Sequence, residues 1–173
     1  MIRILSFLFL FQIGLAQEQQ EPDQVETAAT EVENNFYDAL KHKSMENYDK
    51  AIVSLEQCVL KEAKNPEFYY QLGTNYLALK KYAEAEQNFQ KAVDLNSQQR
   101  WYWNGLYDEY YQIKDFNKAI PVVEKLTTFD ANMKEDLVSL YMNTSQFEKA
   151  KQVLDELEST TNLTKTMEMY KLQ

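Results

Sequence analysis

Between Pro66 and Asn96, apolar residues recur at helical spacing in two runs that a short polar interval separates. The first run contains Tyr69, Leu72, Gly73 and Tyr76, and the second contains Tyr82, Ala85, Phe89, Ala92 and Val93. Each run predicts one apolar face of an amphipathic helix. Leu79, Lys80 and Lys81 between the runs leave no room for a long connection, so the two helices should fold back on each other as an antiparallel hairpin.

The pattern of this hairpin repeats along the chain. The second apolar run has a counterpart around each of four alanines, Ala51, Ala85, Ala119 and Ala150, which follow one another at steps of 34, 34 and 31 residues. A tyrosine or phenylalanine stands three positions before each alanine. One hairpin cannot bury both of its faces, so a regular repeat of this length predicts hairpins stacked on one another.

These residues resemble the tetratricopeptide repeat family, whose pattern places an aromatic residue, Leu, Gly and Tyr on a first helix and Ala, an aromatic residue and Ala on a second. The resemblance implies an all-α fold, a right-handed superhelical solenoid of antiparallel helix pairs. Residues 32–161 would form four such pairs. Residues 162–173 would form either the first helix of an incomplete fifth unit or a capping helix, and Met167 and Tyr170 at helical spacing favour the former.

The N-terminus has a different composition. Residues 1–16 combine Arg3 with an apolar run and end in small residues, which is typical of a signal peptide cleaved after Ala16. The alternative, an anchoring helix, is disfavoured because the run is shorter than the ~20 residues needed to span a bilayer. The mature protein is therefore expected to be exported, periplasmic or secreted, without a membrane span.

Residues 17–31 contain several acidic residues, no aromatic residue and no basic residue, which predicts an acidic disordered linker. A solvated spacer is favoured over an acidic interaction tail. The net charge of the whole chain is −9, and no cluster of Lys or Arg is visible, so nucleic acid is not an expected partner.

Residues with catalytic or metal-binding chemistry are few. The chain has one histidine, His42, and one cysteine, Cys58, which falls where the repeat places a small buried residue. Neither belongs to a known metal-binding pattern, and the three glycines are too scattered for a phosphate loop. The acidic cluster Asp155, Glu156 and Glu158 lies on the polar side of a helix. The sequence therefore predicts no enzyme activity, no metal site and no cofactor.

The resemblance also implies a binding surface, because the first helices of successive repeats line the inside of the solenoid in this family. The positions carried over are Tyr70, Gln71, Thr74 and Leu77 in one unit, Trp101, Asn104, Asp108 and Tyr111 in the next, and Ser139 and Asn143 in the last. Aromatic, amide and hydroxyl groups together are typical of peptide-binding surfaces. The alternative for each ring, Tyr111 especially, is packing against the next hairpin. In this family, the clamp that binds a terminal carboxylate uses Lys and Asn. This chain has Tyr70 and Thr74 at those positions, so a terminal carboxylate is not an expected ligand.

The sequence thus predicts a non-catalytic protein-protein interaction scaffold that binds a peptide or a partner protein in the concave groove of its repeats. Two alternatives remain open at this stage. One is a cell-envelope assembly or chaperone-like factor that holds unfolded or lipid-attached clients. The other is a regulatory segment of a larger enzyme.

Overall fold

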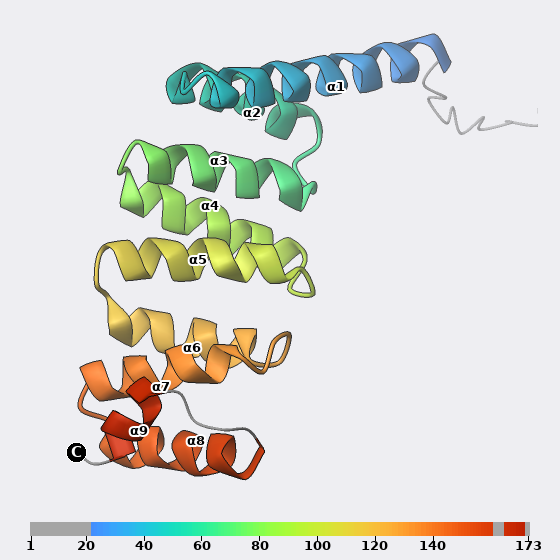
Figure 1. Cartoon of the computed structure of the whole chain (residues 1–173). Helices are drawn as coiled ribbons and strands as arrows, with labels where there is room; N and C mark the ends of the chain where they lie inside the picture. Colours follow the sequence, from blue (N-terminus) through green and yellow to red (C-terminus); the bar gives the residue numbers. More distant parts are fainter. Residues whose placement is uncertain (1–21, 161–164, 172–173) are drawn as a thin grey trace, which may run out of the picture.

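The computed structural model describes residues 22–160 and 165–171 of the chain. These residues form helices and no strand, in the order shown in Figure 1. The helices are α1 (Pro22–Ser44), α2 (Tyr48–Lys61), α3 (Pro66–Ala78), α4 (Tyr82–Leu95), α5 (Arg100–Gln112), α6 (Phe116–Leu126), α7 (Met133–Asn143), α8 (Phe147–Thr160) and α9 (Lys165–Lys171). The predicted signal peptide, residues 1–16, lies outside the described residues.

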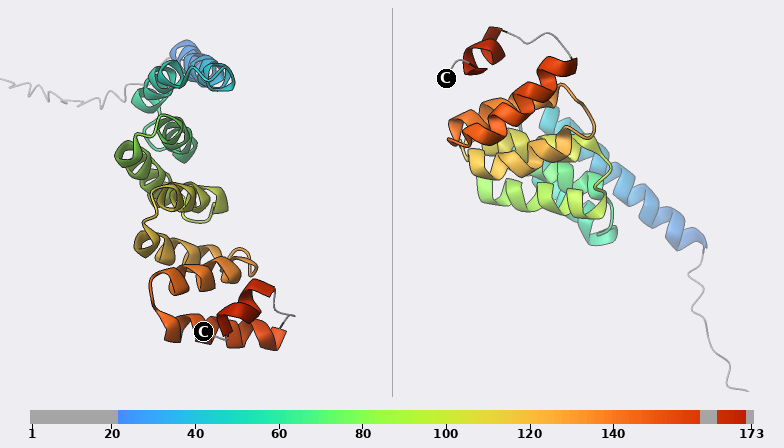
Figure 2. Two further views of the ribbon diagram at one scale, coloured as in Figure 1. Left: turned by 60° about the vertical axis from the view of Figure 1, so that its left-hand side comes forward. Right: turned by 90° about the horizontal axis from the view of Figure 1, so that it is seen from below.

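Consecutive helices pair as antiparallel hairpins, α1 with α2, α3 with α4, α5 with α6 and α7 with α8, and the hairpins stack into a curved column (Figures 1 and 2). The predicted all-α, right-handed solenoid of helix pairs is therefore confirmed. Besides its partner α4, α3 also packs directly against α5, whereas α4 and α6 make no contact of that extent. Side chains link the other first helices, through the hydrogen bond of Lys43 to Gln71 between α1 and α3 and that of Tyr107 to Asp136 between α5 and α7. The first helices α1, α3, α5 and α7 form one side of the column, called here the inner face, and α2, α4, α6 and α8 form the outer face.

The repeated alanines are part of the core. Ala51, Ala85 and Ala119 are completely buried, and Ala150 is 1% exposed. A small buried side chain lets neighbouring helices approach closely, which accounts for alanine at these positions. Cys58 is also completely buried, and its Sγ atom donates to the carbonyl oxygen of Val32.

Each hairpin turn closes in the same way. One residue in each turn is left-handed, with φ close to +58°: Glu46, Lys80, Lys114 and Ser145. In the second hairpin the amide of Lys81 donates to the carbonyl oxygen of Tyr76, and the amide of Lys80 donates to that of Leu77. The other three turns have the same two bonds. This is the Schellman ending of a helix, here formed without glycine.

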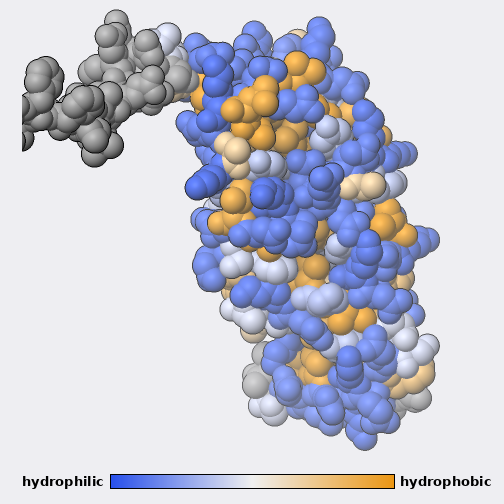
Figure 3. Space-filling model, turned by 180° about the vertical axis from the view of Figure 1, so that it is seen from behind, coloured by the Kyte–Doolittle hydropathy of each residue, from blue (hydrophilic) through white to orange (hydrophobic). Residues whose placement is uncertain are grey.

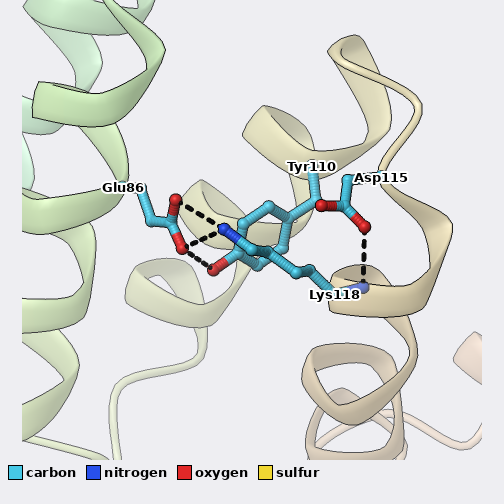
Figure 4. Close-up of polar contacts among 4 residues, drawn as sticks. All are labelled: Glu86, Tyr110, Asp115 and Lys118. Carbon is cyan, nitrogen blue, oxygen red and sulfur yellow. Dashed lines mark hydrogen bonds and ion pairs between the residues drawn. The ribbon is translucent and has the colours of Figure 1, made fainter.

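Contacts between a glutamate, a tyrosine and a lysine join successive units. The Tyr110 hydroxyl of α5 donates to Glu86 Oε1 of α4 over 2.8 Å, and Lys118 Nζ of α6 contacts the same carboxylate at 2.8 Å (Figure 4). The hydroxyls of Tyr76 and Tyr141, at the equivalent positions, donate to Glu56 and Glu124. A lysine amino group lies within 6 Å of each of the three rings. The contact therefore recurs at each of the three junctions between units.

Helix α1 differs from the sequence prediction. It begins at Pro22, so residues 22–31 are helical, whereas the sequence predicted a disordered linker over 17–31. Proline is well suited to the first position of a helix, and Ala28, Ala29 and the glutamates have high helix propensity. Tertiary contacts add to this, because Val32 is buried and Glu31 forms an ion pair with Lys61 of α2 at 2.9 Å. Composition alone underestimated the helix. Residues 17–21 lie outside the described part.

At the other end, α9 packs against both α7 and α8. Met167 is buried there and Tyr170 is partly buried against the same apolar cluster. Both predicted roles for this segment, a cap or the start of a further unit, remain predictions. None of the helices in the described part of the chain combines the length and the apolar character that a membrane-spanning segment requires.

Candidate interaction surface

Tyr70, the first of the predicted site residues, belongs more to the core than to the surface. Its ring contacts the rings of Phe89 and Tyr102, with centroids 5.9 Å and 5.4 Å away. Burial, together with the nearby charges of Glu67 and Asp108, raises the pKa of its hydroxyl. The Tyr70 ring therefore packs on core side chains beneath the inner face. This is the packed alternative that the sequence left open for each ring.

Gln71 and Thr74 are joined by a lysine that the sequence did not single out. Lys43 Nζ, at the end of α1, donates to Gln71 Oε1 and to Thr74 Oγ1, each over 2.8 Å. Burial lowers the pKa of Lys43, while the charge of Glu67 acts in the opposite direction. Gln71 also donates to Glu67 Oε1 over 2.7 Å. These bonds link the first two units across the inner face and fix the predicted polar residues in place.

Helix α5 presents two aromatic rings to solvent. Trp101 is 46% exposed and Tyr111 is 57% exposed, one near each end of the helix. The Tyr111 ring also contacts Tyr107 and Phe116, with centroids 5.8 Å and 6.0 Å away, so it is held in place on one side only. Asn104 is half-buried between them. The sequence favoured packing for Tyr111 as strongly as exposure, and the structure leaves most of the ring accessible.

Two aspartates lie on the inner face of α5 and α7. Asp108 is exposed, but neighbouring atoms displace part of the water around its carboxyl group, and this partial burial raises its pKa. Asp136 accepts a hydrogen bond from the Tyr107 hydroxyl over 3.3 Å. Burial raises the pKa of Asp136 and outweighs the effect of that bond. Burial is the main cause of the raised pKa of Tyr107. The charges of Asp136 and Asp108 and the neighbouring Tyr111 hydroxyl raise this pKa further.

The remaining predicted residues are at the margins of the surface. Leu77 is partly buried against the apolar core. Ser139 donates its hydroxyl hydrogen to the carbonyl oxygen of Glu135 on the same helix, over 3.1 Å. Asn143 is exposed, and its amide donates to the carbonyl oxygen of Ser139 over 2.7 Å. In the described structure these two side chains bond to their own helix.

The sequence reasoning missed Lys43, Glu67, Tyr107 and Asp136. Glu67 receives a hydrogen bond from Tyr102 Oη over 3.3 Å, in addition to that from Gln71. A repeat-by-repeat comparison could have found two of them. Glu67 lies 34 residues before Trp101, and Asp136 lies 31 residues after Gly105, at the steps by which the repeated alanines are spaced.

Hollows between successive units also follow the repeat, each lined by a first helix and by second helices next to it. One of about 440 Å³ is lined by Glu56, Leu60, Tyr69, Leu72, Tyr76 and others, and one of about 470 Å³ by Glu86, Trp103, Leu106, Tyr110, Pro121 and others. Tyr69, Leu72 and Tyr76 are equivalent to Trp103, Leu106 and Tyr110. Seen from behind, the molecule is mostly hydrophilic, with separate hydrophobic patches (Figure 3). Within residues 22–160 and 165–171, no three His, Cys, Asp or Glu side chains are arranged to hold a metal ion.

Comparison with known proteins supports the repeat assignment. Residues 66–99 match the family model for the tetratricopeptide repeat. No curated protein sequence matches the chain. Among solved structures, MamA of Desulfovibrio magneticus RS-1, from residue 41 to its end, is 21% identical with a TM-score of 0.64, and the match covers 72% of each chain.

Two further structures with this fold are described as binding peptides. The first tetratricopeptide repeat domain of Spaghetti (RPAP3), bound to the HSP90 peptide SRMEEVD, is 18% identical with a TM-score of 0.61, covering 67% of this chain and 94% of that one. YrrB, described as having an unusual peptide-binding site, is 15% identical with a TM-score of 0.60, covering 70% and 64%. At these identities the likeness concerns the fold.

Proposed function

We propose that the protein is a non-catalytic scaffold that binds an extended peptide or a segment of a partner protein on its inner face. The observation that carries this proposal is the exposure of Trp101 and Tyr111 on α5, on the same face that carries the exposed Asp108 and the hydrogen-bonded Gln71 and Thr74. Large apolar rings on a surface contribute most of the affinity of many interfaces, and adjacent polar groups orient the ligand.

The arrangement of the inner face supports the same proposal. Lys43, Gln71 and Glu67 hold one another, so these side chains are already ordered before a ligand arrives. Prior ordering lowers the entropy that binding costs. One structure of this fold is bound to a peptide and another is described as having a peptide-binding site, which supports a peptide as the class of ligand but assigns no residue role in this chain.

We infer further that the protein acts after export, because residues 1–16 have the composition of a signal peptide. N-terminal sequencing of the protein recovered from envelope and medium fractions tests this. Export with cleavage predicts a chain that begins at Gln17. A chain that keeps Met1 and stays with the cytoplasmic fraction would contradict export and leave the binding proposal standing.

Three versions of the protein test the binding proposal. Each is crosslinked to the proteins of envelope and medium extracts, and the captured proteins are identified, after the three versions have been shown to have equal helicity. The first is the chain from Gln17 onward. The second carries Trp101→Ala, Asn104→Ala and Tyr111→Ala on the inner face, and the third carries Val53→Ala, Leu60→Ala and Gln90→Ala on the outer face. Tyr70 is left intact because its ring packs in the core. One specific partner, recovered by the first and third proteins and lost by the second, supports the proposal. Equal recovery by all three would refute it.

A further inference from the structure

The inner face has an unbalanced charge. Glu67 of α3, Asp108 of α5 and Asp136 of α7 come from three successive first helices, and together they are called here the acidic row. Tyr107 connects two members of the row, because its hydroxyl donates to Asp136 over 3.3 Å and its pKa is also raised by the charge of Asp108. The pKa of Tyr70 is raised in the same way by the charges of Glu67 and Asp108.

Few cations lie near the row. Helix α3 contains no lysine or arginine, α5 contains only Arg100 and α7 contains only Lys134. Arg100 pairs with Asp130 at 3.3 Å, and Lys134 pairs with Glu156 at 2.8 Å. Lys43 is held by Gln71 and Thr74 at the edge of the row, and its charge interacts with that of Glu67, whereas no cation of the described residues acts in this way on Asp108 or Asp136. Within the described residues, no hydrogen bond or ion pair involves the Asp108 carboxylate.

Exposed rings flank the central member of the row, Asp108. Trp101 lies two turns before Asp108 on α5, and Tyr111 lies one turn after it. An aromatic face attracts a lysine ammonium or an arginine guanidinium, and it also packs against the aliphatic part of either side chain. A carboxylate between two such rings is complementary to a cationic and partly apolar side chain.

We propose that the inner face binds an extended protein segment whose lysine or arginine side chains meet Glu67, Asp108 and Asp136 in succession. This inference rests on the proposed function of the same face and names the class of its ligand. Packed helices such as α3 and α5 lie about 8–10 Å apart, and an extended chain advances about 3.3 Å per residue. Glu67 and Asp108 are also offset along the helices, because Glu67 is equivalent to Trp101, seven residues or about 10 Å before Asp108. Basic residues about three to four positions apart would therefore match the row.

The test uses three fluorescein-labelled peptides of ten residues, with Lys, Gln or Glu at every third position and the same Ala and Leu residues between. Fluorescence anisotropy gives the affinity of each peptide for the chain from Gln17 onward. The Lys peptide should bind at least tenfold more tightly than the Gln or Glu peptide at low salt, and less tightly as salt is added.

Two variants with equal loss of charge locate the site. Asp108→Asn with Asp136→Asn should weaken the Lys peptide at least fivefold, whereas Glu84→Gln with Asp94→Asn on α4 should change its affinity less than twofold. Equal affinity for the Lys and Gln peptides, with binding lost on Trp101→Ala and Tyr111→Ala, would overturn the ligand class and leave the binding face in place. Binding of no peptide, or binding that no inner-face variant changes, would overturn both proposals.

Discussion

Gly105 of α5 lies directly against the Phe89 ring of α4. A Cβ atom at position 105 would lie 2.6 Å from ring carbons Cδ1 and Cε1 of Phe89. A Cβ atom at Gly73 of α3 would meet the same two carbons at the same distance. Phe89 is completely buried, with Gly73 and Gly105 both against its ring. The absence of two side chains therefore creates the space for one ring at the junction of α3, α4 and α5.

Gly105→Ala should destabilise the protein by about 1–3 kcal/mol, as overpacking of a filled core does. The substitution gains up to about 1 kcal/mol of helix propensity, which overpacking outweighs here. Urea denaturation measures the change. The double variant with Phe89→Leu should lose less stability than the sum of the two single variants, because a smaller side chain leaves room for the methyl group. A stabilising effect of Gly105→Ala alone would show that the ring has freedom to move.

Glu109 should make stability depend on pH. Its side chain is completely buried, and neither carboxylate oxygen has a hydrogen-bond partner in the described structure. Burial, reinforced by the charges of Glu86 and Asp115 and opposed by Lys118, raises the pKa of Glu109 to about 7. The folded state therefore binds the proton more tightly than the unfolded state does. The resulting stability is fully present below the usual glutamate pKa and is lost as the pH rises through 7.

Glu109→Gln should accordingly stabilise the protein at pH 8, by about 1–3 kcal/mol, and much less at pH 5. Urea denaturation at both pH values measures this difference, with the exposed Glu148→Gln as the control that should leave the pH dependence unchanged. The explanation fails if the stability of the parent, measured relative to the Glu109→Gln variant, is the same at pH 8 as at pH 5.

Lys80→Gly should stabilise the second hairpin. A residue with a Cβ atom is destabilised by about 1–2 kcal/mol in the left-handed conformation, and glycine avoids this cost. Glycine also loses more conformational entropy on folding, which offsets about 0.5–1 kcal/mol of the gain. The net gain expected in thermal or urea denaturation is about 0.5–1 kcal/mol. Lys80→Ala keeps the Cβ atom and should give no gain. Equal effects of the two substitutions would assign the change to the lysine charge instead.

Tyr110→Phe should weaken the junction between the second and third units. The substitution removes the hydrogen bond to Glu86, and bonds to charged groups contribute about 1.5–3 kcal/mol. Burial opposes ionisation of Glu86, but the hydrogen bonds from Lys118 and Tyr110 hold its pKa below the ordinary value. A double-mutant cycle with Glu86→Gln isolates the pair. Additive effects of the two substitutions would show that the bond contributes nothing to stability.

The periodicity of apolar positions determined the helices from Tyr48 to Asn143 and their pairing. Because the turns are short, each second helix must run antiparallel to the first helix of its pair. The small residues Ala85 and Ala119 allow close packing within their hairpins. The same reasoning underestimated α1. Whether residues 22–31 remain helical depends on α2, which covers Val32 and pairs with Glu31.

The sequence by itself determined the fold, because hairpin geometry follows from local spacing that repeats. Which inner-face residues are accessible was decided only by the tertiary structure. Tyr70 and Trp101 were predicted for the same surface, yet one ring packs on Phe89 and Tyr102 while the other is 46% exposed. Likewise the contact of Lys43 with Gln71 joins residues 28 positions apart. Such differences depend on how neighbouring hairpins are placed, and that placement comes from packing across units rather than from any one helix.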